Sequence, residues 1–129
     1  MLVRSSTQQT FRRRIETLLA RLPAFAHLVL ATYIKTLPSD LDRWAVGNSL
    51  PHEGQRDKLS TQLDTFLLWP DDVYAHIILL VRINHPQLAD QLQIHLDVSP
   101  EDLQRWSAHE HLPEQALRDQ VMSLLMTDV

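Results

Sequence analysis

The stretch Pro38-Ser39-Asp40-Leu41-Asp42-Arg43-Trp44, followed by Leu50-Pro51, returns 62 residues later as Pro100-Glu101-Asp102-Leu103-Gln104-Arg105-Trp106, followed by Leu112-Pro113. Residues 38–66 and 100–128 align without a gap and are identical at 11 of 29 positions. Chance alone would give roughly two identities, and a period of this size is typical of a duplicated supersecondary unit. The sequence therefore predicts two similar units.

Length and composition bound the class of protein. With 129 residues, 44% of them apolar, the chain can bury a core, and two units this small are expected to pack together because each alone is marginal. The absence of cysteine excludes disulfides and thiolate metal sites and fits a cytoplasmic location. No apolar run is long enough to span a membrane, and the basic N-terminal region is not followed by the apolar core of a secretory signal.

Charge is divided unequally between the two copies. Residues 1–69 carry nine Lys and Arg against six Asp and Glu, a net +3, whereas residues 70–129 carry three against ten, a net −7. A polyanion would be attracted to the first part and repelled by the second.

The pattern of apolar residues, prolines and glycines predicts an all-α fold. Only two glycines occur, no strand-like alternation is present, and each proline falls where a helix would begin or end. Gly47 is expected to end the third helix in a left-handed conformation. The first ten residues are predicted to form a flexible basic arm. The predicted helices cover about 10–22, 23–35, 38–46, 51–68, 71–83, 86–96, 100–108 and 113–126, divided at Trp69-Pro70 into domains of residues 1–69 and 70–129.

The second and third helices of each copy have a recognisable spacing. The apolar positions are expected to pack the two helices together, with both tryptophans in the core; they are Leu30, Ile34, Leu41 and Trp44 in copy one, and Leu92, Leu96, Leu103 and Trp106 in copy two. This arrangement resembles the lambda-repressor/Cro-like helix-turn-helix family, whose pattern is roughly L-A-x-x-L-G-V-S-x-x-x-I-x-x-W-E-x-G-x-x-x-P. The resemblance implies two tandem four-helix units and a DNA-binding transcriptional regulator, with the third helix of a unit in the major groove.

The resemblance also implies particular DNA contacts. The family's base-reading positions fall on Pro38, Ser39 and Arg43 in copy one, and its phosphate-binding polar residue falls on His27. Lys35 and Asn48, on either side of the third helix, are further phosphate-contact candidates, as is the arginine run near the N-terminus. The predicted DNA-binding residues are Arg12, Arg13, Arg14, His27, Lys35, Ser39, Arg43 and Asn48.

Several positions depart from the family pattern. The glycine after the second helix is Lys35 in copy one and Asp97 in copy two. Acidic residues lie on both third helices, namely Asp40, Asp42, Glu101 and Asp102. Copy two is therefore not expected to lie on DNA. Arg43 and Arg105 can equally form surface ion pairs with a neighbouring Asp, and the arginine run can be a solvated helix face.

Two functional hypotheses remain from the sequence. The first is a DNA-binding regulator that contacts duplex DNA mainly through copy one, with a homodimer left open. The alternative is a protein-interaction module, on a scaffold that no longer binds DNA, which would use the acidic second copy. An enzyme is not expected because no nucleophile elbow, phosphate-binding glycine loop or flanking carboxylate pair occurs. No cofactor and no metal are expected, since the seven histidines form no helical His pair.

Overall fold

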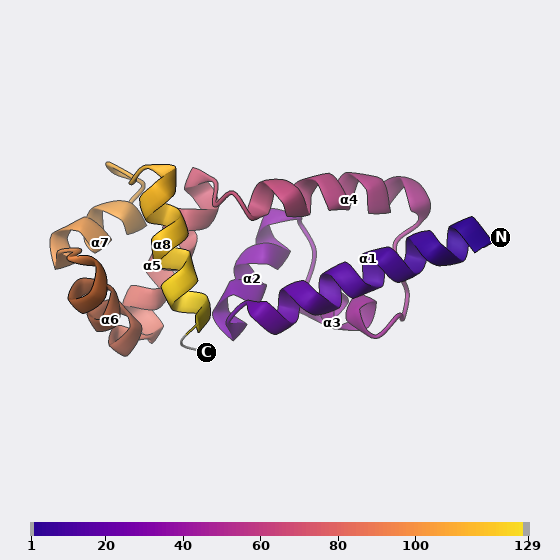
Figure 1. The fold of residues 1–129 in the computed structure, drawn as a ribbon, viewed down its shortest axis with the longest axis horizontal. Coiled ribbons are helices and arrows are strands. Elements are labelled where there is room, and N and C mark those ends of the chain that lie inside the picture. Colours follow the sequence, from indigo (N-terminus) through magenta and orange to yellow (C-terminus); the bar gives the residue numbers. More distant parts are fainter. Residues whose placement is uncertain (1, 128–129) are drawn as a thin grey trace. The chain divides into compact units, whose positions relative to one another are not determined.

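The computed structural model describes the backbone of residues 2–127 and the side chains of residues 8–126. Over these residues the fold is all-helical, with eight helices and no strand (Figure 1). The chain divides into two compact units, unit 1 (residues 1–65) and unit 2 (residues 66–129). The helices are α1 (Leu2–Arg21), α2 (Ala24–Tyr33), α3 (Pro38–Ala45), α4 (Glu53–Phe66), α5 (Asp71–Asn84), α6 (Pro86–Leu96), α7 (Pro100–Ser107) and α8 (Gln115–Thr127).

Seven of the eight helices lie within two residues of their predicted bounds. The exception is α1, which begins at Leu2, so the prediction of a flexible arm over the first ten residues is wrong from that residue on. No proline or glycine precedes Pro23, and nothing in the sequence therefore interrupts the backbone hydrogen bonds of the helix before its first core residue.

Left-handed backbone positions recur in the two units. Gly47 follows α3 with φ +87°, which confirms its predicted place at the helix end. The corresponding residue after α7 is His109, also left-handed. Three pairs of left-handed residues are separated by 62 positions: Lys35 and Asp97, Gly47 and His109, and Ser49 and His111. The backbone thus turns in the same way at the same points of both units.

The core of unit 1 forms where α3 packs against α1 and α2. Leu41 and Trp44 lie on the inner face of α3 and are buried, and the Trp44 ring lies 5.9 Å from that of Phe11 on α1. Other buried side chains of α1 follow at helical spacing: Ile15, Leu18 and Leu22. The predicted core role of Trp44 is confirmed.

In unit 2, α5 packs against α6 and α7, and α6 packs against α8. Trp106 on α7 is buried as predicted, with its ring 5.8 Å from that of Tyr74 on α5. The Tyr74 hydroxyl is buried without a hydrogen-bond partner among the described residues. Burial therefore raises the pKa of Tyr74, and the nearby Arg118 guanidinium offsets only part of this rise.

The repeated arginines Arg56 and Arg118 make the same contact in each unit. The Arg56 guanidinium donates to the Pro51 carbonyl over 2.6 Å, and that of Arg118 donates to the Pro113 carbonyl over 2.8 Å. Arg118 also donates to the Trp69 carbonyl and pairs with Asp71, both at 2.8 Å. Arg118 thus forms a tertiary salt bridge, whereas the described contact of Arg56 is to a backbone carbonyl.

Trp69 stands at the predicted division between the two domains. It lies in unit 2, is buried, and packs with Phe66 at a ring separation of 5.8 Å. Its carbonyl accepts the Arg118 hydrogen bond, so Trp69 is tied to the last helix of that unit.

Within the described residues, no helix combines the length and the apolar character needed to cross a bilayer.

Candidate nucleic-acid interface

The predicted interface is centred on the turn from α2 to α3 in unit 1. Lys35 begins this turn with φ +60°, and its side chain is exposed. The Asp40 carboxylate accepts hydrogen bonds from the Thr36 hydroxyl (2.6 Å) and the Leu37 backbone N–H (3.2 Å). It also pairs with Arg43. Asp40 is therefore a helix-capping residue whose negative charge is largely engaged within the unit.

The outer face of α3 carries two of the predicted contacts. Ser39 and Arg43 are exposed and lie four residues apart, on one face of the helix. Asn48 is exposed beyond the helix, where its backbone N–H donates to the Arg43 carbonyl over 2.8 Å. Asp42 is exposed on the same helix and adds a negative charge. Polar groups thus line α3 from the preceding turn to the residues that follow it.

Three of the predicted contacts bond to other helices of unit 1, or to the residue that follows one, whereas Arg43 pairs within its own helix. Arg12 donates to the Ala45 carbonyl and pairs with Glu16, both at 3.3 Å. Arg14 donates to the Ser60 carbonyl over 3.3 Å and pairs with Asp64, which ties α1 to α4. His27 Nε2 lies 2.9 Å and 3.1 Å from two carbonyl oxygens near the end of α1, those of Leu19 and Leu22.

These bonds sort the predicted residues into two groups. Arg12, Arg14 and His27 serve to pack helices within unit 1, which is a different role from the phosphate contact predicted for them. The other five side chains are exposed: Arg13, Lys35, Ser39, Arg43 and Asn48.

In the corresponding turn of unit 2 the capping carboxylate is present as well, and a serine adds a second capping bond. Ser99 accepts from the Asp102 backbone N–H over 3.1 Å, and the Asp102 carboxylate accepts from the Ser99 backbone N–H over 3.2 Å. Arg105 lies 3.8 Å from Asp102, as Arg43 pairs with Asp40 in unit 1. The ion pairs considered from the sequence are therefore present in both units, and they account for the repeated Asp and Arg without any ligand.

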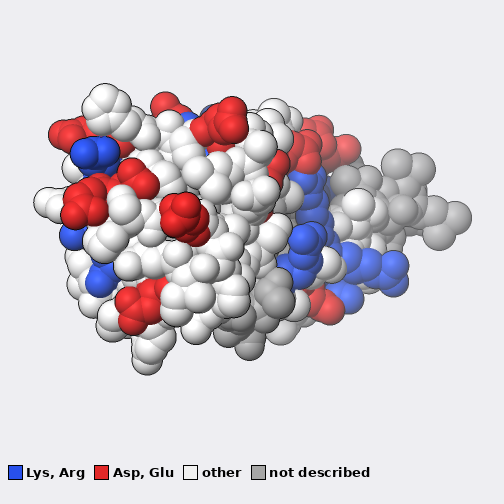
Figure 2. Space-filling view, turned by 60° about the vertical axis from the view of Figure 1, so that its left-hand side comes forward, with Lys and Arg blue, Asp and Glu red and all other residues white. Residues whose placement is uncertain are grey.

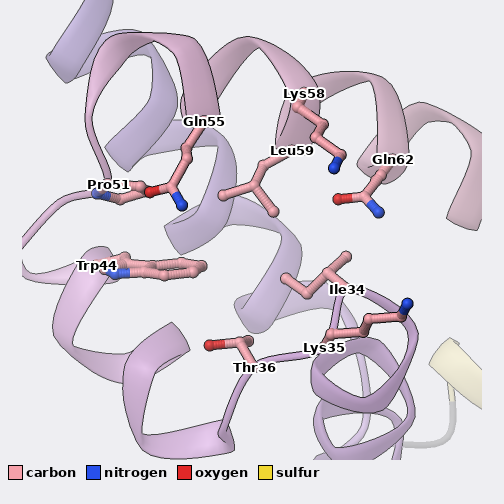
Figure 3. A pocket seen from close by; sticks show the side chains of 9 residues that line it. All are labelled: Ile34, Lys35, Thr36, Trp44, Pro51, Gln55, Lys58, Leu59 and Gln62. Carbon is pink, nitrogen blue, oxygen red and sulfur yellow. The ribbon is translucent and has the colours of Figure 1, made fainter.

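A pocket of about 330 Å³ opens in unit 1 beside the turn between α2 and α3 (Figure 3). Its apolar part is formed by Ile34, Trp44, Pro51 and Leu59. The polar part is formed by Lys35, Thr36, Gln55, Lys58 and Gln62. In Figure 3 the Lys58 and Gln62 side chains descend from α4, and Lys35 lies on the opposite wall, formed by the turn.

Sequence reasoning did not identify the α4 residues of this pocket. A signal was available, because Gln55 and Gln62 stand where the second copy has Leu117 and Leu124. A polar residue in one copy at an apolar position of the other is a candidate for a local function.

The surface of unit 2 is acidic, as the division of charge predicted. Figure 2, in which unit 2 faces the viewer, shows Asp and Glu side chains scattered over it, with few Lys or Arg side chains among them. Within the described part of the chain, no group of three or more His, Asp or Glu side chains is arranged to hold a metal ion.

Comparison of the chain with protein-family models, with curated proteins and with solved structures found no match.

Proposed function

We propose that the protein binds duplex DNA through unit 1, with the outer face of α3 in the major groove, and acts as a transcriptional regulator. The observation that carries this proposal is the exposed polar face of α3. Ser39 and Arg43 point from one side of the helix, between Lys35 in the preceding turn and Asn48 beyond its end. Such a set of groups suits a helix that reads base edges while its two ends contact phosphates.

The engagement of Asp40 supports this proposal. A free carboxylate on a recognition helix would repel phosphates, but Asp40 accepts bonds from Thr36 and Leu37 and pairs with Arg43. Asp42 remains exposed, so the complex is expected to be weaker than one made by a purely basic helix.

Fluorescence anisotropy with a random-sequence duplex tests the proposal. We expect micromolar binding at about 50 mM salt that weakens steeply as salt is raised, since phosphate contacts release bound counterions. Lys35→Gln should reduce the slope of log K against log salt by about one, and Asp42→Asn should strengthen binding because it removes a repulsive charge. An absence of binding at low salt would overturn the proposal.

Arg43→Gln and Arg105→Gln form a matched pair of variants. Each removes an exposed arginine that pairs with the Asp three residues before it, so the local structural loss is the same in kind. Only Arg43→Gln should weaken binding, by about 1–3 kcal/mol on the preferred sequence if the guanidinium reads a guanine. Equal effects of the two variants would contradict base contact by Arg43.

A second candidate function is protein interaction through unit 2. Ile83 and Ile94 are exposed by 65% and 72%, at positions where unit 1 has Arg21 and Thr32. Exposed apolar side chains on an acidic surface are typical of a contact with a basic partner. Affinity capture should recover a partner with the wild-type protein and lose it with Ile83→Ser/Ile94→Ser. Recovery of the same protein by both would contradict this candidate.

A further inference from the structure

The pocket of unit 1 is divided into an apolar and a polar part. Trp44, Ile34 and Leu59 lie on its apolar side, and Figure 3 shows the Trp44 ring extending into the space below Gln55 and Leu59. Lys58 and Gln62 belong to α4, as Leu59 does, and they place an ammonium group and an amide on the polar side of the pocket. A ligand that fits both parts has an apolar body and one polar end.

The charge of the pocket selects an anionic end for that ligand. Lys35 and Lys58 line the pocket, and among the described residues no acidic side chain lines it with them. The adjoining Thr36 donates its hydroxyl hydrogen to Asp40, a carboxylate that also pairs with Arg43. The two ammonium groups and the Gln62 amide therefore offer donors to a carboxylate.

Unit 2 shows that the fold does not require these polar side chains. At the corresponding positions it carries Leu117 for Gln55, Gln120 for Lys58 and Leu124 for Gln62. Asp97 replaces Lys35, and the buried Val98 replaces Thr36. Because unit 2 forms a helix over the corresponding residues with leucine at two of these positions, helix formation does not require the polar set of unit 1, which is free to serve a ligand.

We infer that this pocket binds a small organic acid, with the carboxylate held by Lys58, Lys35 and Gln62 and the apolar body packed against Trp44, Ile34 and Leu59. A volume of about 330 Å³ lies at the lower end of the range of small-molecule sites and suits an acid with one ring or one branched chain. The inference concerns the pocket alone and does not depend on DNA binding.

Titration of the full chain with phenylacetate, followed by two-dimensional NMR, tests the inference. The backbone signals of Lys35 and Thr36 and the indole signal of Trp44 should shift with a Kd of about a millimolar, as expected for a ligand of about ten heavy atoms. Phenylethylamine, which has the same ring and a positive charge, should leave these signals unchanged. Absence of shifts at about 20 mM phenylacetate, or equal binding of phenylethylamine, would overturn the inference.

Three variants complete the test. Lys58→Gln, which introduces the residue of unit 2, should weaken phenylacetate binding about fivefold through loss of an exposed charge pair. Arg13→Gln makes the same change of charge at an exposed residue outside the pocket lining and should leave the Kd unchanged. Gln55→Leu/Gln62→Leu copies the apolar side chains of unit 2 and should abolish binding. An unchanged Kd in Lys58→Gln, or the same loss in Arg13→Gln, would overturn the assignment to this pocket.

Discussion

Unit 1 and unit 2 contain the same succession of helices, yet their fourth helices differ. α4 faces the pocket of unit 1 with Gln55, Lys58 and Gln62, whereas α8 carries two leucines at the first and last of these positions and packs against α6. The buried Leu and Trp of α3 recur in α7, so the two units share these core residues while the three positions of the fourth helix differ. The outward positions are then available for separate functions.

The two units also differ near the start of their second helices, at His27 in unit 1 and Ala89 in unit 2. In unit 1, His27 lies within hydrogen-bond distance of two carbonyls near the end of α1. In unit 2 the corresponding residue is Ala89, which lines a hollow of about 260 Å³ together with Asp90 and Glu101. A position that joins helices in one unit thus borders an opening in the other, which Arg82 lines together with the two carboxylates.

The largest expected effects test whether the two tryptophans are equivalent. Trp44→Ala and Trp106→Ala should each lower the free energy of unfolding of its own unit by about 3–5 kcal/mol, because each removes a buried ring that packs on an aromatic neighbour. Urea denaturation followed by NMR signals from each unit measures both effects. Val46→Ala, at an exposed position after α3, is the control and should change the free energy by less than about 0.5 kcal/mol. A large loss of unfolding free energy in only one of the two variants would show that the two tryptophans do not stabilise their units equally.

The repeated arginines should differ in their effect, although their contact to a proline carbonyl is the same. Arg118→Met removes bonds to two carbonyls and to Asp71, so it should lower the free energy of unfolding by about 2–3 kcal/mol. Arg56→Met should lower it by only about 1 kcal/mol, since Arg56 makes one described hydrogen bond and its buried Nε has no partner among the described residues. Urea denaturation of both variants checks the order, and a larger loss for Arg56→Met would contradict it.

These pairs also show what the sequence could predict. Prolines and the spacing of Leu and Trp determine where α3 and α7 begin and which faces they bury, because both depend on local geometry. The partners of Arg14 could not be predicted in the same way. Asp64 lies 50 residues away from it along the chain, and only the packing of α1 beside α4 brings the two together. Long polar side chains reach several neighbours, so their partners depend on tertiary placement.

The pocket was missed for the same reason. Gln55, Lys58 and Gln62 resemble an ordinary solvated face of α4 when the sequence is considered alone. Their place around one pocket with Trp44 depends on the position of α4 beside the turn between α2 and α3. The exposed residues of α3 were accessible to sequence reasoning because the four-residue spacing of Ser39 and Arg43 is a property of one helix.

Tyr74 distinguishes the units chemically, since the corresponding residue of unit 1 is Arg12. Tyr74→Phe should raise the free energy of unfolding by about 1 kcal/mol at neutral pH, because it removes a buried hydroxyl that has no hydrogen-bond partner among the described residues. Burial raises the pKa of Tyr74 in the folded protein above its ordinary value of about 10, so its deprotonation favours the unfolded state.

The stability of the wild-type protein should therefore fall relative to Tyr74→Phe once the pH exceeds about 10, by up to about 1.4 kcal/mol for each pH unit. Urea denaturation of both proteins between about pH 8 and pH 11 measures this divergence. Other groups that titrate in this range are common to both proteins, so the difference isolates Tyr74. A constant difference across the range would contradict the pKa shift.

The smallest expected effect concerns the helix cap that only unit 2 possesses in full. Ser99 accepts the Asp102 backbone N–H before α7, whereas unit 1 has Leu37 at this place, a residue with 63% of its surface exposed and no side-chain acceptor. Ser99→Ala should lower the free energy of unfolding by about 1 kcal/mol, and Leu37→Ser should raise it by about 0.5 kcal/mol as the new hydroxyl accepts the Asp40 N–H. Leu37→Ala is the control, since it removes the exposed leucine without adding an acceptor. Equal stability of Leu37→Ser and Leu37→Ala would mean that the new hydroxyl does not accept the Asp40 N–H. The capping geometry before α3 would then differ from that before α7.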